Sequence, residues 1–129
     1  MFRVMSVSQC APVPLRDNRG TAVPLVTDAT GARHVDVRLV RLAPSGPAGP
    51  YHFHNHSENV YWILSGQGRL TVEGEDRYVN KDDVVFIPPH TRHALSAAGS
   101  ETLCLLEIFA PAGNDFVPVE EPRTARDRS

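Results

Sequence analysis

The histidines of this chain are unevenly distributed along the sequence. Five of the six fall at His52, His54, His56, His90 and His93. Residues two apart on an extended strand point to the same face, so His52 and His54 can direct both imidazoles at one point. Neutral imidazoles that converge on one point are ligands that zinc, copper, iron and nickel accept in proteins. The pair therefore predicts a site for one divalent transition metal ion.

Strands must position these side chains, and the surrounding sequence predicts them. Runs rich in β-branched and aromatic residues alternate with glycine and proline, which mark turns. We expect strands at 35–42, 60–64, 69–73, 77–79, 84–87 and 102–109. Turn residues at 65–68, 73–76 and 80–83 separate consecutive runs at hairpin spacing, and no apolar stripe recurs at helical spacing. This rhythm predicts an all-β fold, an antiparallel sandwich or small barrel.

The histidine pair and its surroundings resemble the first motif of the cupin superfamily. In that motif a glycine, an H-x-H pair, a glutamate and a closing glycine follow one another. Here the order is Gly46, His52, His54, Glu58 and Gly66, with the strand sequence VYWIL before the closing glycine. The H-x-H pair is thus placed in the context in which cupins use it.

Residues 82–97, DDVVFIPPHTRHALSA, resemble the second cupin motif, in which a proline-containing turn leads to a histidine. Pro88 and His93 stand at the matching positions, and two positions that are glycine in the family are Asp82 and His90 here. The resemblance covers about residues 35 to 110. It implies a small single-domain cupin, an antiparallel double-stranded β-helix or jelly-roll barrel, with His93 as a third metal ligand beside the histidine pair.

The fourth ligand position stays open between Glu58 and Asn59. Counted forward from His54, Glu58 has a spacing that the family allows, whereas counted back from Gly66 the glutamate position holds Asn59. An uninterrupted strand places Asn59 and Tyr61 on one face and Glu58 on the other. A bulge early in the strand would turn Glu58 inward. Because a regular strand needs no bulge, Asn59 is preferred.

Two further residues are candidates for acid or base chemistry. Tyr61 shares the face of Asn59 and could carry a phenol into the cavity, and His90 is the other titratable group near the predicted centre. Arg38 and Arg41 lie on opposite faces of their predicted strand, so at most one points inward, where it would anchor a substrate carboxylate. A solvated position is preferred for both arginines.

The resemblance implies chemistry of several kinds. Three-histidine centres resemble those of thiol and diketone-cleaving dioxygenases, whereas three histidines and a glutamate resemble oxalate-degrading enzymes, germins and sugar isomerases. We expect a metalloenzyme acting on a small polar substrate whose carboxylate or keto-enol group is coordinated to one divalent metal (Fe, Mn, Zn, Ni or Cu), with oxygenase-type chemistry preferred. The alternative is a non-catalytic module that binds a small ligand or the metal itself.

Composition excludes other classes of function. The 13 basic and 15 acidic residues give a net charge of −2, which does not favour nucleic acid as a partner. The longest apolar stretches, such as 60–64 and 84–87, are far shorter than a membrane span, which predicts no membrane association. Residues 1–10 lack the hydrophobic region of a signal peptide, so a cytoplasmic location is expected, with Cys10 and Cys104 reduced.

The length predicts a single domain. We expect an N-terminal arm with edge strands over 1–34, the cupin barrel over 35–119 and a frayed polar tail over 120–129. Short strands and the arm leave sheet edges that a partner can cover. Together with the resemblance to cupins, which are commonly dimeric, this predicts a homodimer.

Overall fold

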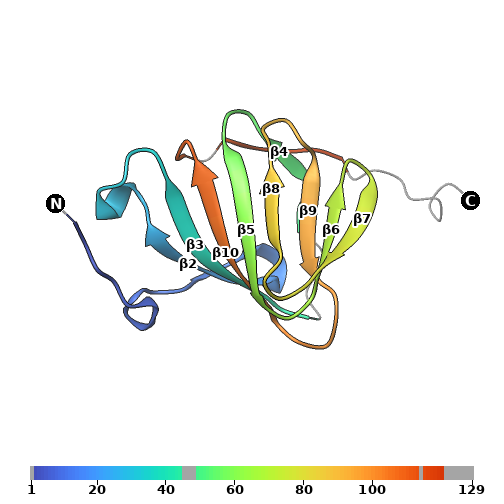
Figure 1. The fold of residues 1–129 in the computed structure, drawn as a ribbon, viewed down its shortest axis with the longest axis horizontal. Helices are drawn as coiled ribbons and strands as arrows, with labels where there is room; N and C mark the ends of the chain where they lie inside the picture. Colours follow the sequence, from blue (N-terminus) through green and yellow to red (C-terminus); the bar gives the residue numbers. More distant parts are fainter. Residues whose placement is uncertain (1, 45–48, 114, 121–129) are drawn as a thin grey trace, which may run out of the picture.

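The computed structural model describes residues 2–44, 49–113 and 115–120, and over these residues it forms two antiparallel sheets (Figure 1). The larger sheet contains β1 (Val13–Pro14), β2 (Gly20–Val26), β3 (Asp36–Leu42), β10 (Leu103–Ala110), β5 (Glu58–Ser65) and β8 (Val84–Ile87), in this spatial order. The smaller sheet contains β11 (Phe116–Pro118), β4 (His52–His54), β9 (His93–Ala97), β6 (Gly68–Val72) and β7 (Glu75–Val79). The predicted all-β, jelly-roll architecture is confirmed.

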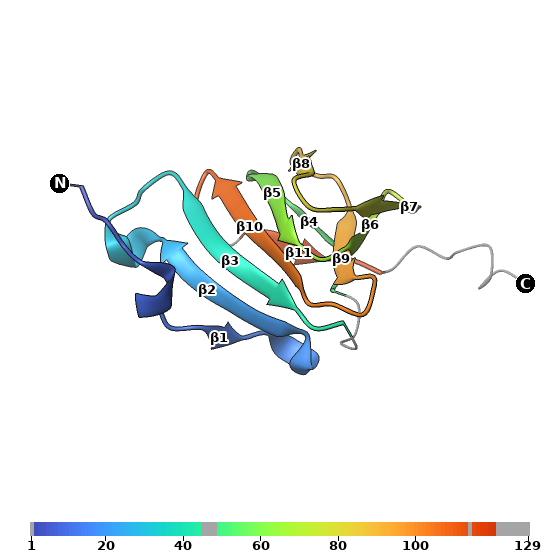
Figure 2. The same ribbon diagram turned by 60° about the horizontal axis from the view of Figure 1, so that its bottom comes forward.

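Short 3-10 helices accompany the strands near the N-terminus. They are η1 (Val7–Gln9), η2 (Arg16–Asn18) and η3 (Asp28–Thr30). Figure 2 shows that η2 lies where the N-terminal segment turns into β2, at one end of the larger sheet. In the described parts of the chain, no helix has the length and apolar character needed to cross a membrane.

The core lies between the two sheets and draws side chains from both. Its buried members are Ala22, Val40, Leu42, Tyr61, Ile63, Ile87, Leu103 and Leu105 from the larger sheet, and Leu70, Val79 and Leu95 from the smaller sheet. Ile63 and Leu103 have no exposed surface. Replacing such a side chain with alanine costs about 2–5 kcal/mol, because the cavity left behind does not close fully.

The interior changes from apolar to polar along the strands. In the register of β5 with β10, Ile63 lies opposite Leu105, whereas Tyr61 lies opposite Glu107 two residues further along. Asn59, at the start of β5, is also buried. One end of the space between the sheets is therefore filled by aliphatic side chains, and the other end is lined by groups that can hydrogen-bond.

Gly66 allows the chain to turn from β5 into β6. Its φ of +81° lies in the left-handed region, and a Cβ atom at this position would lie 2.5 Å from the carbonyl oxygen of Thr102. No side chain fits there. The turn expected at 65–68 is thus fixed by a close approach between two backbones.

The six predicted strands correspond to β3, β5, β6, β7, β8 and β10, and β4 carries the predicted histidine pair. Four further strands, β1, β2, β9 and β11, were not predicted individually, although β1 and β2 lie in the segment 1–34 where edge strands were expected. β2 contains Pro24, β9 directly follows a proline-rich turn, and β11 is three residues long and ends at Pro118, so each lacks a clear pattern. Gly46 and the tail from residue 121 lie outside the described residues.

Candidate metal centre

Three histidines meet between the sheets at the polar end of the interior. His52 and His54 lie on β4, and His93 begins the neighbouring strand β9, directly opposite His52. One ligand atom of each ring lies within 4.8 Å of those of the other two rings. His54 and His93 are buried, and His52 is half-buried. The structure thus brings together two residues of one strand and one of the next.

Two of the three rings are held by the backbone of their own segments. Nδ1 of His52 lies 2.7 Å from the carbonyl oxygen of Pro50, and Nδ1 of His93 lies 2.8 Å from that of Thr91. A carbonyl oxygen only accepts, so each Nδ1 carries the proton and donates it. Nε2 of each ring is therefore left with a free lone pair, as a metal-ligating histidine requires.

The third ring, that of His54, is held by a carboxylate from much later in the chain. Nδ1 of His54 donates to Oδ1 of Asp115 over 3.0 Å, and Oδ2 of Asp115 accepts from the backbone N–H groups of His56 (2.6 Å) and Ser57 (2.8 Å). Although desolvation favours the neutral acid, these hydrogen bonds lower the pKa of Asp115 to about 2. The charged carboxylate orients the imidazole and raises its basicity.

The free nitrogen atoms suit a metal ion. Nε2 of His54 and Nε2 of His93 are buried and have no hydrogen-bond partner among the described residues. Burial lowers the pKa of His52 to about 3, with a further contribution from the charge of His93, and burial also lowers the pKa of His93. Both rings are thus neutral at pH 7. Because an unpaired buried acceptor costs about 1–3 kcal/mol, a ligand that accepts these lone pairs is favoured.

β5 turns Asn59 inward and leaves Glu58 in solvent. Asn59 is completely buried, Tyr61 is buried on the same face, and Glu58 is exposed. The irregularity in the pairing of β5 with β10 lies opposite Leu105, far from Glu58, so β5 begins as a regular strand. This corrects the alternative in which an early bulge turns Glu58 toward the histidines. Asn59 lies near the centre: Phe109, its partner across β10, packs with its ring centroid 5.1 Å from that of His54.

β4 and the start of β9 carry the three histidines and lie side by side, with β5 to β8 between them in sequence. Residues 38–109 match the model of the cupin domain. The chain belongs to the cupin family.

Individual proteins resemble this cupin over part or nearly all of its length. An uncharacterised protein of Methanocaldococcus jannaschii is 37% identical over 65 residues, 50% of this chain and 52% of that protein. The acireductone dioxygenase of Bacillus pumilus is 29% identical over 77 residues, 55% of this chain and 43% of that enzyme. This cupin therefore spans about half the length of these curated relatives.

A solved structure extends the likeness to nearly the whole chain. The polyketide cyclase RemF from Streptomyces resistomycificus superimposes with a TM-score of 0.82, covering 95% of this cupin and 88% of that chain at 20% identity. At this level of identity the likeness establishes the fold. The chemistry of this cupin has to be inferred from its own side chains.

Tyr61 lies beside the histidine cluster. Its ring centroid is 6.3 Å from that of His93, and its phenol is buried. Burial, reinforced by the negative charge of Glu107, raises the pKa of Tyr61 well above 10, so the phenol stays protonated at neutral pH. Tyr61 thus keeps a hydrogen-bond donor beside the histidine cluster.

Arg38 pairs with a buried carboxylate, and Arg41 is exposed. Arg38 donates from Nε to Oε1 of Glu107, its partner across the β3–β10 pairing, and the Glu107 carboxylate is buried. The side chain of Arg38 is still 39% exposed, so Arg38 combines a partly solvated position with this ion pair, whereas Arg41 is exposed. Because Glu107 takes the charge of Arg38, this arginine is already neutralised within the protein.

His90 does not join the cluster. It is exposed, its ring lies 5.8 Å from that of Phe53, and Phe53 alternates with His52 and His54, so it lies on the opposite face of β4. This corrects the expectation that His90 serves as an acid or base at the centre. His90 and Asp82 have φ angles of +65° and +68°. Both positions that are glycine in the family's second motif thus keep a left-handed backbone in this cupin.

Two residues of the site were not predicted. Asp115 belongs to no recognisable sequence motif. It lies after β10 in sequence and reaches His54 only through the tertiary fold. Glu107 could have been predicted from the sequence, because it shares one face of the strand 102–109 with Leu103 and Leu105. If that apolar face is buried, the carboxylate of Glu107 lies in the core. A charge on the apolar face of a strand is a candidate functional group.

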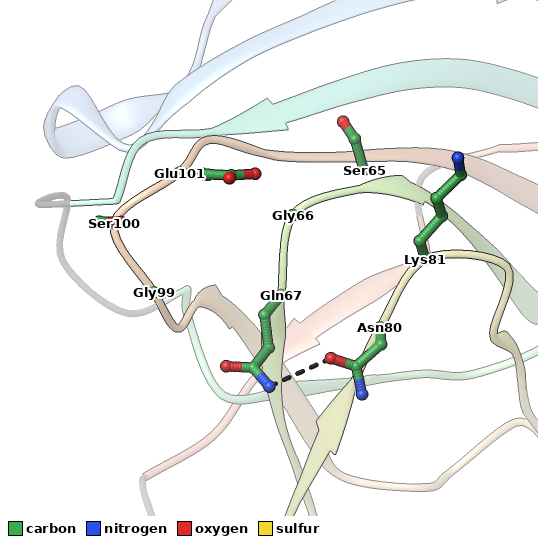
Figure 3. A pocket seen from close by; sticks show the side chains of 8 residues that line it. All are labelled: Ser65, Gly66, Gln67, Asn80, Lys81, Gly99, Ser100 and Glu101. Carbon is green, nitrogen blue, oxygen red and sulfur yellow. Dashed lines mark hydrogen bonds between the residues drawn. The ribbon is translucent and has the colours of Figure 1, made fainter.

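An open pocket of about 530 Å³ lies at the other end of the sheets (Figure 3). It is lined by Ser65, Gly66, Gln67, Asn80, Lys81, Gly99, Ser100 and Glu101. Gln67 donates to Asn80 across it over 3.1 Å, so its own residues satisfy part of its polar lining. The pocket contains none of the histidines, and the site described above is separate from it.

Proposed function

We propose that this cupin is a metalloenzyme that holds one divalent transition metal ion through the Nε2 atoms of His52, His54 and His93. The proposal rests on one observation: all three rings donate from Nδ1 to oxygen acceptors, and two of the Nε2 atoms are buried without a partner. This is the arrangement in which neighbouring groups fix a metal-ligating histidine. Fe, Mn, Zn, Ni and Cu are all compatible with imidazole ligands.

The bound ion would supply Lewis acidity toward the oxygen atoms of a substrate. The three neutral imidazoles leave its charge uncompensated, so an anionic carboxylate or keto-enol group is the favoured substrate head group. Asn59, at the buried start of β5, offers an amide oxygen and no negative charge. The protein thus selects for a ligand that carries the negative charge itself.

The remaining side chains of the interior position such a substrate. Tyr61 holds its proton at neutral pH and can donate it in a hydrogen bond to a substrate oxygen. The Arg38–Glu107 pair closes the polar end of the larger sheet, and the aliphatic core beyond Tyr61 keeps bulk water out.

Oxygenase-type chemistry is the reaction class that we prefer. It is supported by the three-histidine arrangement, in which Glu58 is turned into solvent, and by the partial likeness to an acireductone dioxygenase. A small-molecule ligand remains the proposed partner, and a cytoplasmic location is part of the same proposal.

The test is anaerobic purification, metal analysis, and loading of the metal-free protein with each ion separately. Each form is then given 2-oxo acids, thiols and diketones, and oxygen uptake is measured. We expect one ion per chain and uptake with the iron form. Metal binding without turnover of any substrate by any form would contradict the enzymatic proposal and favour a binding module. Failure to retain any metal would contradict the proposal entirely.

A further inference from the structure

Arg19 enters the space between the sheets from the N-terminal segment. It directly follows η2 and precedes β2, and its backbone is tied at both sides: its N–H donates to the carbonyl oxygen of Arg16 (3.3 Å), and its carbonyl oxygen accepts from the N–H of Ala43 (2.7 Å). The residue is therefore held in place by two neighbouring segments, which fixes the point from which its long side chain extends.

The guanidinium of Arg19 lies between the two histidine-bearing segments. A Cβ atom at Gly49 would lie 2.6 Å from Nη2 of Arg19 and 2.8 Å from the carbonyl oxygen of Leu95. Gly49 precedes His52 by three residues, and Leu95 follows His93 by two. The absence of a side chain at Gly49 thus provides the room in which the guanidinium packs beside β9, next to the metal-binding histidines.

One donor of the half-buried Arg19 lacks a partner within the described residues. Its Nε is buried and has no hydrogen-bond acceptor there. The carboxylate nearest to it in the interior, Glu107, is engaged by Arg38. Burial and the charge of Arg38 lower the pKa of Arg19. A buried N–H without an acceptor costs free energy, which an anionic ligand that accepts from this guanidinium would recover.

The spacing of Leu95 from His93 gives the approximate span between the guanidinium and the histidines. Leu95 is two residues along β9 from His93, and two residues of a strand rise by about 7 Å. That separation is comparable with the distance between the end carboxylates of a five-carbon diacid.

We propose that Arg19 anchors the distal carboxylate of the substrate, so that the substrate is a small diacid with its metal-binding oxygen atoms at the other end, such as a 2-oxo diacid. This inference rests on the proposed function and adds to it a substrate class and a specificity-determining residue. The guanidinium accepts a carboxylate through two parallel hydrogen bonds, which a lysine cannot reproduce.

The first arm of the test uses two ligands that share a head group. 2-Oxoglutarate and 2-oxopentanoate differ in the distal carboxylate, and both are titrated by calorimetry into the zinc-loaded protein under anaerobic conditions. We expect wild type to bind 2-oxoglutarate about 10–100-fold more tightly, the range of a charge-assisted hydrogen-bonded pair. Arg19→Gln should remove this preference and leave the affinity for 2-oxopentanoate unchanged, and Arg19→Lys should retain part of it.

Arg16→Gln is the matched control, since Arg16 lies in the same turn and is exposed. It should behave as wild type. Thermal unfolding without ligand is a second readout: Arg19→Gln should be close to wild type in stability, because Arg19 is only half-buried and has a buried donor without an acceptor. The inference would be overturned if Arg19→Gln lost affinity for both ligands equally, or if it kept the full preference for 2-oxoglutarate over 2-oxopentanoate.

The second arm separates this inference from the proposed function. Glutarate and pentanoate are added to the metal-free protein, and chemical shifts of backbone amides near Gly49 and Leu95 are followed by NMR. We expect shifts with glutarate that Arg19→Gln abolishes and Arg16→Gln keeps. If the protein binds no zinc but glutarate still causes shifts that depend on Arg19, the proposed metal site is refuted and the role of Arg19 in carboxylate binding is supported. If zinc binds but neither the calorimetric nor the NMR result depends on Arg19, the role of Arg19 is refuted and the proposed metal site is supported.

Discussion

Nδ2 of Asn59 donates a 3.2 Å hydrogen bond to the phenol oxygen of Tyr61, two residues along the same strand. The hydroxyl of Tyr61 is therefore an acceptor toward Asn59, and its own proton is free for another group. The amide oxygen of Asn59 is buried and has no partner among the described residues. One pair of side chains thus presents both a donor and an acceptor to whatever occupies the interior.

Asn59→Asp should tighten metal binding by about tenfold or more, because a negative charge is added next to a divalent cation in a poorly solvated space. Glu58→Gln should leave the affinity unchanged, since Glu58 is exposed. Competition with a chromophoric chelator measures both values. A steep loss with Glu58→Gln would show that Glu58 reaches the ion, and equal affinities for all three proteins would show that neither residue touches it.

Replacing His52 and His93 together with alanine should reduce bound metal from about one ion per chain to nearly none, because one imidazole cannot hold a divalent ion in competition with water. His56→Ala is the control, since His56 is exposed two residues beyond His54. Elemental analysis after dialysis gives the stoichiometry. Undiminished occupancy in the double variant would contradict the assignment.

Asp115→Asn should weaken metal binding by about 10–100-fold, the usual effect of losing a carboxylate that orients a metal-ligating histidine. The amide can still accept from His54, but it supplies no charge. Asp76→Asn, at an exposed carboxylate of β7, should have no effect. Zinc affinities of the three proteins decide the matter, and an unchanged affinity in Asp115→Asn would remove Asp115 from the site.

Acid should reduce the contribution of Asp115 to folding in the metal-free protein. Its pKa falls from 3.8 to about 2 on folding, so its stabilising effect is complete above the unfolded value and is lost as pH falls through the folded value. Urea unfolding of wild type and Asp115→Asn should show a constant difference in the free energy of unfolding above about pH 5 that shrinks toward pH 2. A difference that grows on acidification would contradict this sign.

We propose that a second copy of the chain covers the outer face of β5 and β8. Trp62 lies opposite Val84 in this pairing, and Trp62, Val84 and Phe86 are exposed. β8 is also an edge of the larger sheet. Phe86→Glu should shift a homodimer to the 14.2 kDa monomer in sedimentation velocity, whereas Tyr78→Glu on the other sheet should not. A wild-type protein that sediments only as a monomer at micromolar concentration would refute the proposal.

The strands and the inward face of β5 could be predicted from sequence because both depend on local periodicity. The period-two pattern alone places Asn59 and Tyr61 on one face and Glu58 on the other, and the structure follows it. Gly66 is likewise local, since its turn requires a left-handed residue. For these residues the nearest neighbours in sequence carry enough information.

Arg19, His90 and Asp115 could not be placed in this way. Arg19 lies in a segment without periodicity, and its place beside β9 and Gly49 depends on how these distant segments pack together. His90 is near His93 in sequence, yet its left-handed backbone turns it to the outer face of β4. Asp115 contacts a residue about half the chain length away. Such contacts are set by tertiary packing.

The acceptors for the three histidine rings differ in how far away they lie along the chain. His52 and His93 each donate to a carbonyl oxygen two residues earlier, whereas His54 donates to Asp115. During synthesis on the ribosome, two rings can be oriented as soon as their own segments have emerged, but the third must wait for the segment that forms β11. The three rings can therefore all be oriented only after nearly the whole described chain has been translated and folded. A chain terminated before Asp115 would lack the acceptor for His54.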